Sequence, residues 1–178
     1  EVETITGMLE DPRRPFVAVL GGSKVSDKIG VIDRLIDTVD TLLVGGGMAF
    51  TFVRAQGHDV GTSLLEQDWV QKAGEMVEKA RAKGCDLVLP VDYVVADRFA
   101  DDATTEVVAA DAIPEGMMGL DVGPRTVELY AAKIAQARTI FWNGPMGVFE
   151  MPSFEAGTRG VAQAIADNAA ANSIVGGG

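Results

Sequence analysis

The segment VLGGSKVSDKIG (residues 19–30) places two lysines where an anion could bind. Lys24 and Lys28 are four residues apart, so they share one face of a predicted helix, away from its apolar stripe. Lysine is electrostatically unfavourable at a helix N-terminus, which already carries partial positive charge. Two lysines beside Gly22 and free backbone amides therefore suit a bound phosphate group. The alternative is two solvated lysines that Asp27 compensates locally.

A second polar set lies in FWNGPMGVFE (residues 141–150). Asn143 offers amide donors at the end of an apolar run, Pro145 stiffens the following turn, and Glu150 is able to accept a hydrogen bond from a ribose diol. An ordinary Asn-Gly turn and a surface glutamate are the alternative interpretation.

Several familiar chemistries are disfavoured by what the sequence lacks. No G-x-x-x-x-G-K-[ST] motif occurs, and no G-x-G-x-x-G opens the first helix, so neither a P-loop nor a dinucleotide site is expected. A Ser-His-Asp triad would need the single histidine, His58, which lies in the polar segment AQGHDVG and is interpreted as solvated surface.

Five short, continuously apolar runs predict the strands of a sheet. Continuous rather than alternating apolarity is typical of parallel strands that are buried on both faces. The expected strands are residues 16–20, 41–44, 87–91, 139–142 and 173–175.

Helical patterns fill the intervals between these runs. Apolar residues recur at helical spacing over residues 25–39, 66–83, 127–134 and 154–169, and Gly84 follows the second of these segments. Alternating strands and helices predict an α/β fold, a three-layer open parallel sheet with helices on both faces, Rossmann-like in type. Residues 92–123 interrupt the alternation and suggest an inserted strand or hairpin followed by a glycine-rich loop, EGMMGLDVG.

Four of the five expected strands end in glycine-bearing turns. These turns hold Gly21-Gly22, Gly45-Gly46-Gly47, Asn143-Gly144-Pro145 and Gly176-Gly177-Gly178. In an open α/β sheet the carboxyl edge of the strands is where ligands bind. Glycines there let backbone amides approach an oxygen-rich ligand, although βα turns also favour glycine for purely architectural reasons. Four such turns on one edge favour a binding site.

Charge and length narrow the class of partner. The 178 residues suit one domain with a substantial core, and 15 basic against 26 acidic residues give a formal net charge of −11. That balance disfavours nucleic acid or an anionic membrane as a partner, because both attract basic surfaces. The apolar runs are too short to span a bilayer.

Six segments together resemble the nucleotide-binding half of phosphoglycerate kinase. They occur in the order of that family and cover nearly the whole chain: RPFVAVLGGSKVSDKI, LLVGGGMAFTF, GTSL, LPVDYVVADRF, MMGLDVGP and FWNGPMGVFE. The resemblance implies a cytoplasmic, monomeric glycolytic enzyme that transfers a phosphoryl group between 1,3-bisphosphoglycerate and MgADP, giving 3-phosphoglycerate and MgATP. It also implies that residues 16–178 form a nucleotide-binding domain and that residues 1–15 end a helix joining two lobes.

The resemblance also assigns the site residues. Lys24 and Lys28 match the lysines that contact the nucleotide phosphates, with Lys28 closest to the transferred group. Asn143 matches a further phosphate contact. The remaining matches are glycine backbone near the nucleotide (Gly22, Gly45, Gly46, Gly47, Gly176, Gly177 and Gly178), the adenine slot (Leu64, Gly119, Leu120 and Val148) and the ribose side (Pro145 and Glu150).

Further parts of the family pattern are expected outside this sequence. The aspartate that serves Mg²⁺ is expected just beyond Gly178, so no metal ligand is assigned within the chain. The lobe that holds phosphoglycerate is expected before residue 1. These expectations predict that the chain alone binds nucleotide but does not turn over. A non-catalytic nucleotide-binding module and a structural or interaction domain remain the alternative functions.

Overall fold

The computed structural model describes residues 12–176 of the chain. The expectation of a helix end over residues 1–15 falls almost wholly outside this range, and so do Gly177 and Gly178. Within the described range, no helix is long and apolar enough to cross a membrane.

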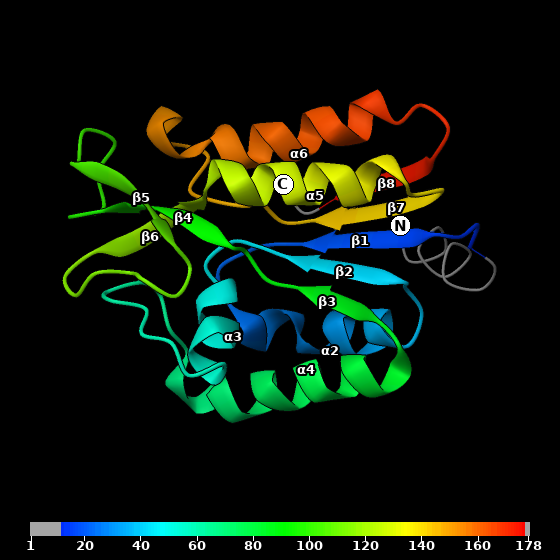
Figure 1. Ribbon diagram of the computed structural model, residues 1–178, viewed down its shortest axis with the longest axis horizontal. Helices are drawn as coiled ribbons and strands as arrows, with labels where there is room; N and C mark the ends of the chain where they lie inside the picture. The colour runs from blue at the N-terminus through cyan, green and yellow to red at the C-terminus, as the bar shows by residue number, and fades with distance from the viewer. Residues whose placement is uncertain (1–11, 177–178) are drawn as a thin grey trace.

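A parallel sheet of five strands forms the middle layer, in the order β3-β2-β1-β7-β8 (Figure 1). β1 lies at its centre, every residue of β1 is buried, and Phe16 pairs with Thr139 of β7. All five predicted strands are confirmed, although β3 ends before Pro90, which cannot donate to a sheet. The strands are β1 Phe16–Leu20, β2 Thr41–Val44, β3 Asp86–Val88, β7 Thr139–Asn143 and β8 Asn172–Gly176.

Helices cover both faces of this sheet, as the predicted three-layer fold requires. In Figure 1, α2, α3 and α4 lie below the sheet and α5 and α6 lie above it. Alternate residues of β1 divide between the two faces: Ala18 and Leu20 pack towards α2 and α4, whereas Val17 and Val19 pack towards α5 and α6. The helices are α2 Val25–Ile36, α3 Ala49–Ala55, α4 Val70–Lys83, α5 Pro124–Ala135 and α6 Ala156–Asp167.

The predicted helix over residues 66–83 starts as a short 3₁₀ turn, η1 (Gln67–Trp69), before α4. It ends at Gly84, whose φ of 78° is left-handed and favours glycine. A second 3₁₀ turn, η2 (Pro152–Phe154), precedes α6. The sequence did not indicate α3, because its residues from Ala49 to Val53 are all buried and show no amphipathic stripe.

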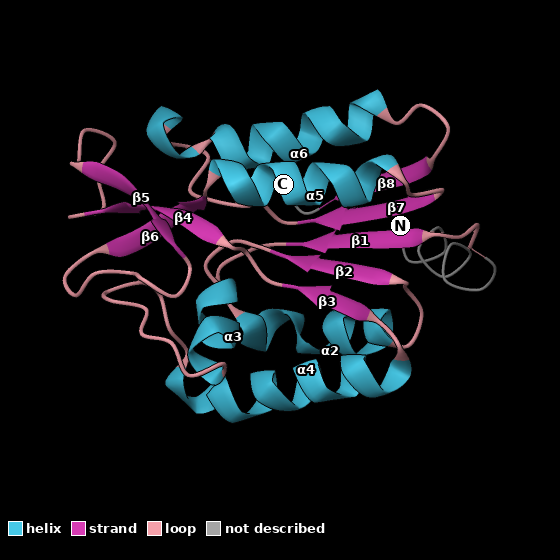
Figure 2. Cartoon of the chain, in the orientation of Figure 1, coloured by secondary structure: helices cyan, strands magenta, loops and turns pink. Residues whose placement is uncertain are grey.

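A smaller antiparallel sheet, ordered β5-β4-β6, lies beyond the carboxyl ends of the main strands, at the left of Figure 2. The predicted interruption over residues 92–123 is thus confirmed. The expectation of a glycine-rich loop was wrong, because Met118–Val122 form strand β6 beside β4. Gly119 is needed there, since the ring of Phe50 occupies the space of a Cβ. The other strands are β4 Asp92–Ala96 and β5 Thr105–Ala109.

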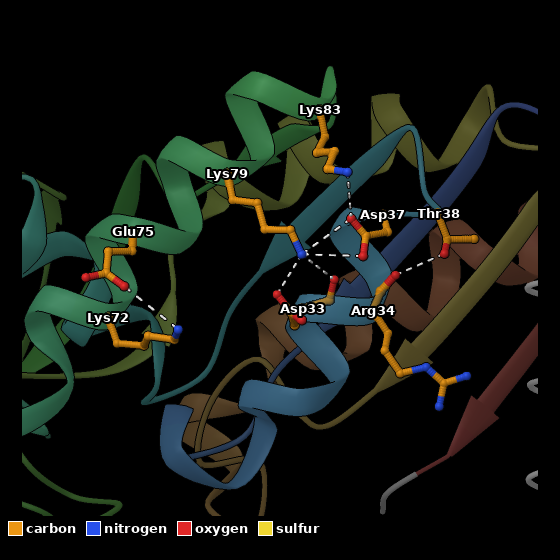
Figure 3. Close-up of polar contacts among 8 residues, drawn as sticks. All are labelled: Asp33, Arg34, Asp37, Thr38, Lys72, Glu75, Lys79 and Lys83. Carbon is orange, nitrogen blue, oxygen red and sulfur yellow. Dashed lines mark hydrogen bonds and ion pairs between the residues drawn. The ribbon is translucent and has the colours of Figure 1, made fainter.

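An ion-pair network joins α2 to α4, two of the helices that lie below the sheet in Figure 1; Figure 3 shows it in close-up. Lys79 of α4 donates to Asp33 at 2.6 Å and lies 3.4 Å from Asp37. Asp33 lies in the second half of α2, and Asp37 directly follows the helix. Lys83 also approaches Asp37, at 3.6 Å. The C-terminal half of the helix that carries Lys28 is therefore held by a neighbouring helix as well as by the core.

Candidate functional site

Three glycine-bearing turns meet at the carboxyl edge of the main sheet. The turn after β1 bonds to the turn after β7, because Gly22 donates to the Pro145 carbonyl at 3.2 Å. The turn after β2 bonds to both of the others: Gly46 donates to Met146 at 3.1 Å, and Met48 donates to Gly22 at 3.0 Å. The three segments form one hydrogen-bonded surface.

Glycine is required where these turns touch. A Cβ on Gly46, whose φ is +73°, would lie 2.5 Å from the Gly22 amide nitrogen, and one on Gly21 would lie 2.1 Å from the Pro145 oxygen. A Cβ on Gly45 would lie 2.4 Å from the sulfur of Met146. Some of these glycines are therefore required for contact between the turns, whether or not a ligand binds.

Next to this surface is a cavity of about 540 Å³, open on one side between the turns and β6. Met118 and Leu120 of β6 form one wall, and Phe99 lies at the rim with 59% of its surface exposed. Nine of the predicted site residues line the cavity: Gly22, Gly46, Gly47, Leu64, Gly119, Leu120, Pro145, Val148 and Glu150.

The predicted phosphate contacts lie beside the cavity and do not line it. Lys28, on the first turn of α2, donates from Nζ to Oδ1 of Asn143, and its side chain passes across the Gly22 turn. Gly176 is paired with Asn143 through β7 and β8, so it belongs to the same edge. Lys24 is exposed at the residue before α2, and Gly45 lies beneath the turns against Met146.

The N-terminus of α2 already has an acidic partner. Glu66 accepts from the Ser26 amide at 3.1 Å and from the Ser26 hydroxyl at 2.5 Å. Burial works to raise the pKa of Glu66, but its hydrogen bonds to Ser26 and the Val25 amide outweigh burial, so the pKa lies below its ordinary value. The expectation of free amides at this helix start was therefore wrong at Ser26.

A second carboxylate lies in the cavity wall. Asp121 of β6 is 2% exposed and accepts from the Val122 amide and the Gly157 amide, each at 2.9 Å. Gly147 and Gly157 crowd its carboxyl group so closely that neither could carry a Cβ. Burial raises the pKa of Asp121 to about 7, against the opposing effect of the two amides.

The floor of the cavity is aromatic. The rings of Phe50 and Tyr93 lie with centroids 4.7 Å apart, and both side chains line the cavity. The Tyr93 hydroxyl is buried and has no hydrogen-bond partner in the described part of the chain. Burial raises the pKa of this hydroxyl, with a smaller contribution from Asp92.

Sequence reasoning missed Asp121, Tyr93, Phe50 and Glu66. Asp121 lies in the segment interpreted as a loop, and Phe50 in the helix that the pattern did not reveal. A signal existed for Glu66, because GTSLLEQ places an acid close after Leu64. Only the fold shows that this acid reaches α2, which lies forty residues earlier in the chain.

Magnesium is implied by the resemblance, and the aspartate expected to serve it lies outside the described residues. Over residues 12–176, no three histidine, cysteine, aspartate or glutamate side chains come close enough together to hold a metal ion. No step of the chemistry proposed below depends on a metal held by this part of the chain.

Comparison with known proteins gives one consistent result. A family model described as phosphoglycerate kinase matches residues 1–178. The chain is 58% identical over 178 residues to phosphoglycerate kinase of Frankia casuarinae and 55% identical over 179 residues to that of Acidobacterium capsulatum. Each match covers 100% of this chain and 44% of the relative.

Solved structures agree with the sequence matches. Phosphoglycerate kinase from Coxiella burnetii superposes with a TM-score of 0.95 at 51% identity, and that from Pyrococcus horikoshii with 0.83 at 30%. Both comparisons cover 99% of this chain and 45% of the other. The chain therefore spans less than half the length of the relatives it matches. By family model, sequence and structure, the chain belongs to the phosphoglycerate kinase family.

Proposed function

We propose that this chain is the nucleotide-binding part of a glycolytic phosphoglycerate kinase. The observation that carries the proposal is the cavity at the sheet's carboxyl edge, which adjoins the Lys28–Asn143 pair. The apolar cavity suits the base of a nucleoside diphosphate, and the neighbouring Lys28 and Asn143 suit its phosphates. The hydrogen-bonded turns lie between these two parts and would offer backbone groups to the middle of the ligand.

In this proposal the base enters the slot formed by Leu64, Gly119, Leu120 and Val148. Gly119 lets Phe50 approach β6 closely, so the slot has an aromatic floor against which a flat ring could pack. Exposed Glu150 lies at the cavity, beside the turn of Pro145, and would accept from the ribose hydroxyls.

The phosphates would lie towards Gly22, Lys24, Lys28, Asn143 and the glycines of the β2 and β8 turns. In the forward reaction, a β-phosphate oxygen of ADP forms a bond to the acyl phosphorus of 1,3-bisphosphoglycerate. The bond from that phosphorus to the acyl oxygen breaks, and 3-phosphoglycerate leaves as its carboxylate. This chemistry needs in-line positioning and positive charge around the moving group more than it needs a protein nucleophile. The ammonium of Lys28 would supply part of that charge.

The remainder of the proposed activity depends on residues outside the described range. We propose that phosphoglycerate is held mainly by another lobe and that the magnesium-linked aspartate follows Gly178, as the resemblance implies. The isolated chain would then bind ADP without measurable turnover in a coupled assay. The whole enzyme is proposed to be a cytoplasmic monomer that contacts neither nucleic acid nor membrane.

The proposal is tested by titrating the chain with ADP in a calorimeter, together with Lys28→Ala and the control Lys72→Ala. Lys72 is exposed on α4, away from the cavity. We expect saturable binding to the parent chain and to the control, and binding weaker by roughly tenfold to a hundredfold in Lys28→Ala. Equal affinity in all three proteins would contradict the placement of the phosphates. A folded parent chain that bound no ADP would contradict the function itself.

A further inference from the structure

The segment from Ser63 to Glu66 is attached at both of its ends to different walls of the cavity. At one end, the Ser63 hydroxyl accepts from the Gly119 amide of β6 at 2.8 Å, and Ser63 is 8% exposed. At the other end, Glu66 bonds to Ser26 at the start of α2. The segment therefore connects β6, where the base is proposed to bind, to α2, where the phosphates are proposed to bind.

Leu64 lies between these two attachment points. It is 53% exposed, and its Cδ2 lies 3.0 Å from the position that a Cβ on Gly47 would take. The side chain thus lies over the β2 turn at the cavity. The backbone of Glu66 is held as well, because its amide donates at 3.3 Å to the hydroxyl of Thr51, a buried residue of α3.

α2 has no cap of its own. The residue before the helix, Lys24, makes no capping hydrogen bond with its side chain, and its backbone is extended. The carboxylate of Glu66 takes that place from forty residues away and satisfies the Ser26 amide. Lys24 and Lys28 each lie two residues from the capped residue, so both lysines are close to this bond.

We propose that Glu66 is a positioning residue for the nucleotide: it sets the spacing between the Leu64 side of the cavity and the first turn of α2. The inference rests on the proposed function. The predicted change in ADP affinity has the opposite sign to the one expected from charge alone, because a carboxylate near bound phosphates repels them. If charge were its only effect, removing it would tighten ADP binding, whereas loss of positioning weakens it.

The test compares Glu66→Gln with Asp68→Asn in calorimetric titrations with ADP and NMR titrations with adenosine. Asp68 is an exposed acid two residues further on, in η1, so the control removes the same charge without touching α2. We expect Glu66→Gln to weaken ADP binding about tenfold, close to 1.4 kcal/mol, and to leave adenosine binding within about twofold. The control should bind ADP as the parent chain does.

Ser26→Ala provides a second route that does not rely on one variant. It removes the hydroxyl that Glu66 accepts from at 2.5 Å. If Glu66 acts through α2, the double variant should bind ADP little more weakly than Glu66→Gln alone, since both changes weaken the same connection. Without ligand, the Ser26 amide should also exchange its hydrogen faster in Glu66→Gln.

These measurements distinguish failure of the positioning role from failure of the proposed function. Unchanged or tighter ADP binding in Glu66→Gln overturns the positioning role and leaves the proposed function intact. Parallel loss of adenosine and ADP binding, or additive effects with Ser26→Ala, shows a general disturbance of the fold and also overturns it. A folded parent chain that binds no ADP removes the proposed function and this inference with it.

Discussion

The buried carboxyl group of Asp121 should make the stability of this chain depend on pH in an unusual direction. Its pKa is raised by burial to about 7 in the folded chain, from the ordinary aspartate value of 3.8. The folded state therefore binds the proton more tightly than the unfolded state, so protonation favours folding. The resulting stabilisation is complete below the unfolded pKa and is lost as the pH rises through the folded value.

The size of the effect follows from these two values. Between about pH 5 and about pH 8, this one group should lower the free energy of unfolding by about 3 kcal/mol. Asp121→Asn cannot titrate. The variant keeps an acceptor for one amide but turns its NH₂ towards the other, so its own cost is the same at every pH. The difference in unfolding free energy between parent and variant should therefore shrink by that amount from the lower to the higher pH.

Urea denaturation followed by circular dichroism, at the two pH values, measures this difference directly. Asp111→Asn serves as the control, because Asp111 is an exposed aspartate in the turn after β5 and its replacement should leave the pH dependence of the parent chain in place. If Asp121→Asn retained the full pH dependence of the parent, the carboxyl group of Asp121 would not be the titrating group and the reasoning from its burial would be refuted.

Two substitutions and one labelling experiment test other parts of the molecule. Tyr93→Phe removes a buried hydroxyl that has no partner among the described residues, so unfolding in urea should show a free energy unchanged or higher by up to about 1 kcal/mol; a loss would reveal an unseen partner. Gly46→Ala forces a Cβ onto a left-handed residue against Gly22, and both stability, by roughly 2 kcal/mol or more, and ADP affinity should fall; an unaffected variant would show that the turns can separate freely. Because burial raises the pKa of Cys85 to about 11, its reaction with a thiol reagent near neutral pH should be slow until urea unfolds the chain; rapid labelling of the folded chain would contradict this burial.

The sequence predicted most of the fold because strands and helices carry their own periodicity. Over residues 12–176, the five apolar runs and four of the five helices lie where apolar spacing indicated them, although β8 is largely exposed and not buried on both faces. The sequence did not reveal α3 or β6 for physical reasons. In α3, the residues from Ala49 to Val53 are all buried, so no amphipathic stripe forms. In β6, Gly119 resembles a loop residue until the ring of Phe50 is seen beside it. Local patterns do not show what will pack against them.

The same limit applied to the candidate site. The glycine-bearing turns and the lysines predicted a binding site at the carboxyl edge of the sheet, because those residue types have a local backbone or charge signature. Asp121 and Glu66 did not, since a carboxylate is significant there only through partners far along the chain, such as the Gly157 amide for Asp121 and Ser26 for Glu66. Tertiary contact, and not residue type, makes these two acids part of the site.

The strand order β3-β2-β1-β7-β8 also governs when the cavity can exist during folding. β1, β2 and β3 follow one another in the first half of the chain and pair as neighbours, so they and α2 and α4 can associate early. β7 must then join β1 although their paired residues Phe16 and Thr139 are far apart in sequence, and such long-range pairing is slow because a large loop has to close first. The cavity needs β6 and the β7 turn as well as the β1 and β2 turns. Ligand binding would thus be acquired only after β6 and the β7 turn had joined the sheet that β1, β2 and β3 form.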